Sequence, residues 1–132
     1  MDPTPRDVPT GAAVMVLHGD PVTRAFLIDN LVADGYEVLA ASGLLDGARL
    51  LAGPEPPVAA IVDLRAAGRE LAGRLADARR QRGMVLIGLA RDLASAGTGG
   101  LFLDDVVAVP FSCPELRARL AHALLAAGRQ AA

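Results

Sequence analysis

The sequence predicts an α/β fold built on a doubly wound, five-stranded parallel sheet. Short apolar runs suited to strands alternate with longer stretches whose apolar residues recur at helical spacing, which is typical of βα units joined by right-handed crossovers. The run at 58–62, Val-Ala-Ala-Ile-Val, is wholly apolar, as expected of a central parallel strand that is covered on both faces. With 132 residues, the chain has the length of one domain.

The first predicted elements are a strand at 12–17 and a helix from Pro21 to about residue 34. Asp20 offers a side-chain acceptor at the N-cap of this helix, and Pro21 suits its first turn because proline has no amide hydrogen to leave unpaired. Glycine at position 35 favours an end to the helix. The apolar spacing predicts an inner face made of Phe26, Leu27 and Leu31.

The middle of the chain predicts the next two βα units. A strand at 37–40 precedes a helix at 44–51, which a Gly- and Pro-rich linker closes. The apolar strand at 58–62 is expected to lead into a loop that runs through Gly68. A helix at 69–82 follows, with Leu, Leu and Ala at buried positions of its inner face.

The last part of the sequence predicts two further strands and two helices. A strand is expected at 84–89, and a short, weak helix at 91–96 because several glycines follow it. The fifth strand is expected at 106–108. Ser112 and Glu115 have the spacing of a capping box for a last helix that continues to about residue 127.

The composition predicts one domain at 12–128, after a flexible leader at 1–11 and before a tail or the start of a linker at 129–132. The leader has no apolar core of the kind a signal peptide needs, and no run is long enough to span a membrane. We therefore expect a cytoplasmic protein. Cys113 is the only cysteine, which excludes an internal disulfide. A net charge of −2 argues against nucleic-acid binding by the domain itself.

Asp63 is the one plausible chemical centre, because it follows the central strand and sites of α/β sheets lie at the carboxyl ends of strands. The other strand ends that should lie near it carry His18, Gly19, Leu89 and Val109. The chain has no lysine, and all thirteen of its basic residues are arginine. Asp63 therefore lacks the catalytic partners that would be sought beside a carboxylate placed for chemistry.

The strand ends, taken in order, resemble the receiver domain of bacterial two-component response regulators over about residues 12 to 127. The resemblance implies the flavodoxin-like (CheY-like) (βα)5 fold. The matching segments are His18-Gly19-Asp20-Pro21 with Arg24, Asp34-Gly35-Tyr36-Glu37-Val38, Ile61-Val62-Asp63-Leu64-Arg65, Asp104-Asp105 and Pro110-Phe111.

In that family, the aspartate at the position of Asp63 accepts a phosphoryl group from a histidine kinase. Two acidic residues hold Mg²⁺ beside it, and these positions carry His18 and Gly19 here. The family's hydroxyl, aromatic switch and lysine correspond to Leu89, Val106 and Val109. The resemblance therefore implies a degenerate receiver without Mg²⁺ or another cofactor, a signalling module and not an enzyme. The alternative is an active phosphoreceiver that accepts a phosphoryl group on Asp63.

The remaining residues of this degenerate pocket have two interpretations each. His18 is either an imidazolium that pairs with Asp63, with a raised pKa, or a solvated loop residue. Asp20 is expected to cap a helix more than to bind a cation, and Arg65 to point to solvent. The Val109–Pro110 bond is expected to keep the family's cis peptide.

The last helix resembles that of OmpR/PhoB-type receivers, in which Glu and Arg residues pair with acidic residues across a symmetric dimer. That resemblance implies a homodimer through the fourth helix, fifth strand and fifth helix, although an exposed amphipathic helix gives a similar pattern. The residues concerned are Asp104, Asp105, Glu115, Arg117 and Arg119.

The same resemblance implies a separate DNA-binding output domain and a sensor histidine kinase or another protein as partner. Whether this chain is full-length or an excised domain stays open. A flavin- or cobalamin-binding module is a third possibility, but no Gly-rich phosphate loop follows the first strand.

Overall fold

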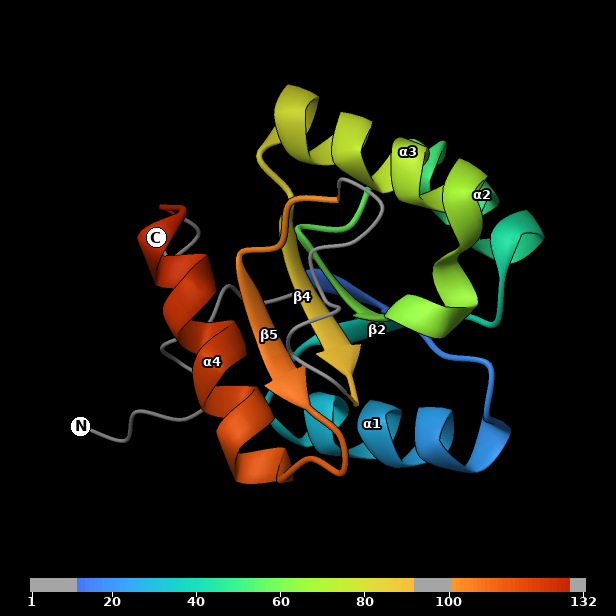
Figure 1. The fold of residues 1–132 in the computed structure, drawn as a ribbon. Helices are drawn as coiled ribbons and strands as arrows, with labels where there is room; N and C mark the ends of the chain where they lie inside the picture. The colour runs from blue at the N-terminus through green and yellow to red at the C-terminus, as the bar shows by residue number, and fades with distance from the viewer. Residues whose placement is uncertain (1–11, 92–100, 129–132) are drawn as a thin grey trace.

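In the computed structural model, which describes residues 12–91 and 101–128, five parallel strands form one sheet in the order β2-β1-β3-β4-β5 (Figure 1). The predicted doubly wound architecture is therefore confirmed. The strands are β1 (Ala13–Leu17), β2 (Glu37–Ala41), β3 (Ala59–Asp63), β4 (Val85–Ala90) and β5 (Asp105–Ala108). The helices are α1 (Pro21–Ala33), α2 (Leu44–Leu51), α3 (Leu64–Arg82) and α4 (Cys113–Ala126).

Two layers of apolar side chains hold the helices against the sheet. Helices α1 and α4 cover one face, and α2 and α3 cover the other. The five residues of β3 are all buried, as the apolar run at 58–62 predicts for a central strand. In the described ranges, no helix is both long enough and apolar enough to cross a membrane.

Helix α1 begins as predicted, but one residue of its expected inner face lies outside. Asp20 is the N-cap, and its Oδ2 accepts a hydrogen bond from the Thr23 amide at 3.0 Å. Leu27 and Leu31 are buried, whereas Phe26 is 53% exposed. Residues four apart share a helix face, and the residue before Leu27 is turned away from it by about 100°. The prediction for Phe26 is therefore wrong.

Helix α3 begins earlier than predicted. The segment expected to be a loop forms a helical turn directly after Asp63, which serves as the N-cap. Gly68 then interrupts the helix with φ 67° and ψ 170°, a left-handed conformation that glycine adopts at little cost. The helix ends at Gly83, which has φ 71°.

The last βα unit keeps its predicted order with small shifts of its bounds. Ser112 caps α4 by accepting from the Glu115 amide at 3.4 Å, which is one half of the predicted capping box. The Val109–Pro110 bond is cis, as predicted. The expected leader at 1–11, most of the short helix at 91–96 and the tail at 129–132 lie outside the described residues.

Candidate functional site

The register of the sheet places Asp63 between the ends of two neighbouring strands. Val62 pairs with Leu17 of β1, so His18 follows on one side of Asp63. On the other side Asp63 itself pairs with Leu89 of β4. The sequence prediction that these strand ends meet at one edge of the sheet is confirmed.

The Asp63 carboxylate is buried and already bound within the chain. The residue is 7% exposed, and its Oδ1 accepts from the Arg65 amide at 3.2 Å. The Arg65 Nε lies 3.5 Å from the same oxygen, although 66% of the Arg65 side chain is exposed. The expectation that Arg65 points to solvent holds for most of that side chain, but not for its Nε.

His18 is a buried neighbour of Asp63 and not a solvated loop residue. It is 7% exposed, and its Nε2 lies 3.7 Å from Asp63 Oδ2. Its Nδ1 accepts a hydrogen bond from the Asp20 amide at 3.0 Å. Only a neutral imidazole has a ring nitrogen that can accept, so this bond places the proton on Nε2, facing Asp63. This geometry favours a neutral histidine beside the carboxylate over the expected imidazolium–carboxylate pair, and the protonation of His18 stays a prediction.

Gly19 and Asp20 lie at the surface, whereas Asp63 is buried. Gly19 is exposed. Asp20 Oδ2 accepts from both the amide and the hydroxyl of Thr23, at 3.0 and 2.6 Å. These bonds to Thr23 lower the pKa of the Asp20 carboxyl. As predicted, Asp20 caps a helix.

The donors near Asp63 do not fit Mg²⁺, which prefers oxygen ligands in near-octahedral geometry. They are one carboxylate that accepts from Arg65, one imidazole whose Nδ1 accepts from the Asp20 amide, and a glycine, which has no side-chain ligand. Within residues 12–91 and 101–128, no group of three or more His, Cys, Asp and Glu is placed to hold a metal ion. Leu89 is 1% exposed, while Val106, Val109 and Phe111 are half-buried. Pro110 is exposed.

The five residues of the predicted dimer face lie in three places. Asp105, Glu115 and Arg119 form one cluster, in which Arg119 Nη1 donates to both oxygens of Asp105 at 2.9 Å. The Arg119 Nε lies 3.6 Å from Glu115. This cluster joins β5 to α4 within one chain.

The other two residues of that face pair elsewhere in the chain. Arg117 forms an ion pair with Asp34 at the end of α1. Asp104 pairs with Arg79 of α3, whose Nε and Nη2 lie 3.2 and 2.8 Å from its oxygens. In the single chain Asp104 and Arg117 are thus bound to α3 and α1, and pairing of the five residues across a dimer stays a prediction.

The Arg79–Asp104 pair, like the Arg117–Asp34 pair, was not predicted from the sequence. Asp104 Oδ2 also accepts from the Leu86 amide at 2.8 Å, and the Phe102 ring lies 4.0 Å from the Arg79 guanidinium. Burial raises the pKa of the Asp104 carboxyl, but the hydrogen bonds from Arg79 and Leu86 outweigh it and the pKa is lowered. Twenty-five residues separate the pair, and no local pattern marks it.

No protein-family model matches the sequence, and no curated protein gives a significant match. Solved structures do match. A signal receiver domain of an HD domain-containing protein from Pseudomonas fluorescens is 20% identical with a TM-score of 0.74, covering 89% of this chain and 98% of that one. The chemotaxis response regulator CheY4 of Vibrio cholerae is 18% identical with a TM-score of 0.71, covering 87% and 100%.

A third similar structure contains a metal. It is the receiver domain of the sensor histidine kinase PA1611 from Pseudomonas aeruginosa, solved with magnesium coordinated in its active-site cleft. It is 18% identical with a TM-score of 0.70, covering 87% of this chain and 98% of that one. Together these likenesses show that the chain has the receiver (CheY-like) fold.

Proposed function

We propose that this chain is an atypical receiver domain of a bacterial response regulator, which signals without Mg²⁺-dependent phosphorylation of Asp63. The receiver fold supports the class of protein. The arrangement around Asp63 supports the atypical part of the proposal.

The observation that carries the proposal is the bound state of the Asp63 carboxylate. Phosphoryl transfer depends on metal ions and cationic groups to neutralise the developing charge. Here the cation beside Asp63 is Arg65, whose side chain is 66% exposed, and His18 lies 3.7 Å from the other carboxylate oxygen. A phosphoryl group on Asp63 would place its oxygens near the apolar Leu89, and burial of unpaired charge is costly.

The same proposal assigns the cluster of Asp105, Glu115 and Arg119 to a homodimer interface. The cluster carries both signs of charge, so the same patch on two copies can be complementary to itself across a two-fold axis. In this proposal the module works in the cytoplasm. It controls an attached DNA-binding output and receives its signal from a sensor histidine kinase or another protein.

Phosphorylation is tested by incubating the protein with Mg²⁺ and acetyl phosphate and measuring its intact mass. We expect no stoichiometric gain of about 80 Da, the mass that one phosphoryl group adds. An Mg²⁺-dependent receiver treated in parallel serves as the positive control. A stoichiometric gain that disappears in Asp63→Asn and persists in Asp20→Asn would favour the active phosphoreceiver and refute the proposal.

Dimerisation is tested by sedimentation over a concentration series. Arg119→Glu should weaken self-association, because it places three acidic side chains together. The matched variant Arg74→Glu reverses the same charge on the exposed face of α3 and should leave association unchanged. A wild-type protein that stays monomeric throughout the series would contradict the dimer proposal.

A further inference from the structure

Helix α4 has two stripes of side chains on opposite sides. The buried stripe, which holds the helix against the sheet, consists of Cys113, Leu116, Leu120 and Leu124. The second, here called the outer stripe, consists of Glu115, Ala118, His122 and Leu125. All four members of the outer stripe are exposed, and they follow one another at alternating intervals of three and four residues. That spacing is typical of a helix that packs against another helix.

The composition of the outer stripe also suits a contact surface. A surface helix usually presents charged and polar side chains on the side away from the core. Here the only carboxylate is that of Glu115, while Leu125 is 50% exposed and Ala118 offers only a methyl group. Burial of Leu125 against a partner would therefore be favourable.

The polar members of the outer stripe are placed to pair with an identical stripe. Glu115 and His122 are seven residues apart, which is two turns and about 10 Å along the helix. In a second copy of α4 that runs antiparallel about a two-fold axis midway between them, Glu115 of each copy lies opposite His122 of the other. The axis passes beside Ala118, whose small side chain permits a close approach of the two helices.

The two polar side chains are available for such a pair. An imidazole can donate a hydrogen bond to a carboxylate whether or not it is protonated. Within the described ranges, His122 has no hydrogen-bond or ion-pair partner. The Oε1 of Glu115 lies 3.6 Å from the Arg119 Nε, which is longer than a hydrogen bond.

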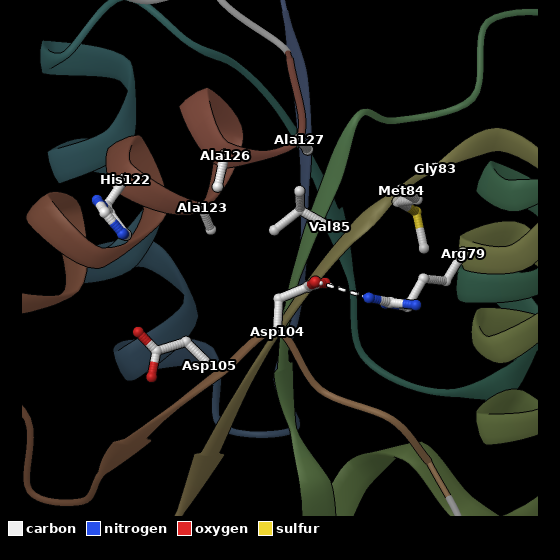
Figure 2. Close-up of a pocket in the computed structure, with 10 residues that line it drawn as sticks. All are labelled: Arg79, Gly83, Met84, Val85, Asp104, Asp105, His122, Ala123, Ala126 and Ala127. Atoms are coloured by element: carbon white, nitrogen blue, oxygen red, sulfur yellow. Dashed lines mark hydrogen bonds and ion pairs between the residues drawn. The ribbon is translucent and has the colours of Figure 1, made fainter.

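The charged groups around His122 are already paired among themselves. His122 lines a hollow together with Arg79 of α3 and with Asp104 and Asp105 (Figure 2). Arg79 is bound to Asp104, and Asp105 is bound through both oxygens to Arg119 of α4. These pairs leave the imidazole as the group that a carboxylate of a second copy can reach.

We propose that α4 packs against the α4 of a second copy through the outer stripe, antiparallel, with Glu115 of each chain bonded to His122 of the other. The inference rests on the homodimer proposed above and adds the helix pair, its direction and its register. The Asp105–Arg119 pair stays within each chain and flanks the contact. Because histidine gains a positive charge between about pH 5 and 8, the contact also makes self-association depend on pH.

An exchange of the two paired residues tests the register by sedimentation over a concentration series at pH 7. His122→Glu should weaken self-association about tenfold, because carboxylates then lie opposite each other. Adding Glu115→His to the same chain exchanges the two residues and should restore association to within about threefold of the wild type. The matched variant Gln81→Glu adds the same charge at an exposed position of α3 and should have no effect.

The pH dependence is measured in the same assay. Wild-type self-association should tighten about three- to tenfold between pH 8 and pH 6, since a protonated imidazole attracts the carboxylate opposite it. His122→Gln keeps a hydrogen-bond donor without the charge change and should remove this dependence. The melting temperature of each variant at low concentration shows that the single chain is folded.

The direction of the helix pair is tested by cysteine cross-linking under mild oxidation. Ala118→Cys should form a disulfide-linked dimer, because position 118 lies beside the two-fold axis. Leu125→Cys should not, because the two copies of position 125 are about 20 Å apart along antiparallel helices. A parallel pair would cross-link at both positions.

The outcomes separate this inference from the dimer proposal on which it rests. A protein that dimerises equally well with His122→Glu and with Gln81→Glu would overturn the helix pair and leave the dimer in place. Equal cross-linking of Ala118→Cys and Leu125→Cys would overturn the antiparallel direction. A wild-type chain that stays monomeric at every concentration and pH would refute both.

Discussion

The substitution Asp104→Asn tests whether Asp104 stabilises the single chain or pairs with a second copy. Its carboxylate accepts two hydrogen bonds from Arg79, at 3.2 and 2.8 Å, and one from the Leu86 amide at 2.8 Å. Asparagine keeps an oxygen for the Leu86 amide but removes the charge. The variant therefore isolates the pairing with Arg79.

The expected loss of stability follows from the exposure of the pair. A hydrogen bond to a charged group contributes about 1.5–3 kcal/mol, but exposed ion pairs contribute about 1 kcal/mol or less. The Arg79 and Asp104 side chains are 31% and 25% exposed, which places them between these cases. We expect Asp104→Asn to lower the free energy of unfolding by about 1–2 kcal/mol and the melting temperature by about 3–8 °C.

The loss of stability in Asp104→Asn should become smaller at low pH. The folded-state pKa of the Asp104 carboxyl lies below its ordinary value of 3.8, because the bonds from Arg79 and Leu86 outweigh its burial. A carboxyl group whose pKa is lowered by folding contributes its full stabilisation at pH values above its ordinary pKa. The stabilisation is lost as the pH falls through the folded pKa. The difference between wild type and variant should therefore narrow as the pH is lowered below 3.8.

The assay is urea unfolding of wild type, Asp104→Asn, Arg79→Met and the double variant at several pH values and protein concentrations. A coupling energy of about 1 kcal/mol that does not change with protein concentration is expected for a pair within one chain. A coupling energy near zero, or one that appears only at concentrations where the protein dimerises, would refute the assignment of Asp104 to the single chain.

Two further substitutions test the packing near the site. His18→Ala should cost about 1–3 kcal/mol because it removes a buried side chain and leaves the part-buried Asp20 amide without its acceptor, and ¹⁵N NMR should find the His18 proton on Nε2. A proton on Nδ1 would contradict the proposed tautomer. Gly88→Ala should cost about 1–3 kcal/mol, because its Cβ would lie 2.8 Å from the Leu103 Cδ1. The matched change Gly73→Ala, in an open helical position, should stabilise by about 0.5–1 kcal/mol, and equal effects would contradict this contrast.

The elements that sequence reasoning placed well depend on local chemistry. Asp20 is followed by Pro21, which suits the first turn of a helix, so its role as the N-cap could be predicted from adjacent positions. The early start of α3 is harder to predict. Gly68 suggests a loop, but the Leu-Arg-Ala-Ala segment before it consists of good helix formers, and Asp63 is placed to cap them.

In the candidate site, too, some features can be predicted from the sequence and others cannot. The sequence places His18 and Leu89 beside Asp63 because the ends of parallel strands meet. It does not decide which arginine each carboxylate binds, since the partners of Asp104 and Asp34 lie 25 and 83 residues away. With thirteen arginines available, that choice depends on how the helices pack and not on local spacing.

If Asp63 is not phosphorylated, another binding event must supply the free energy that shifts the domain between states, because a ligand shifts an equilibrium only by its differential affinity. In the proposed function that event is dimerisation through Asp105, Glu115 and Arg119, so the two states of the domain must differ in how tightly they self-associate.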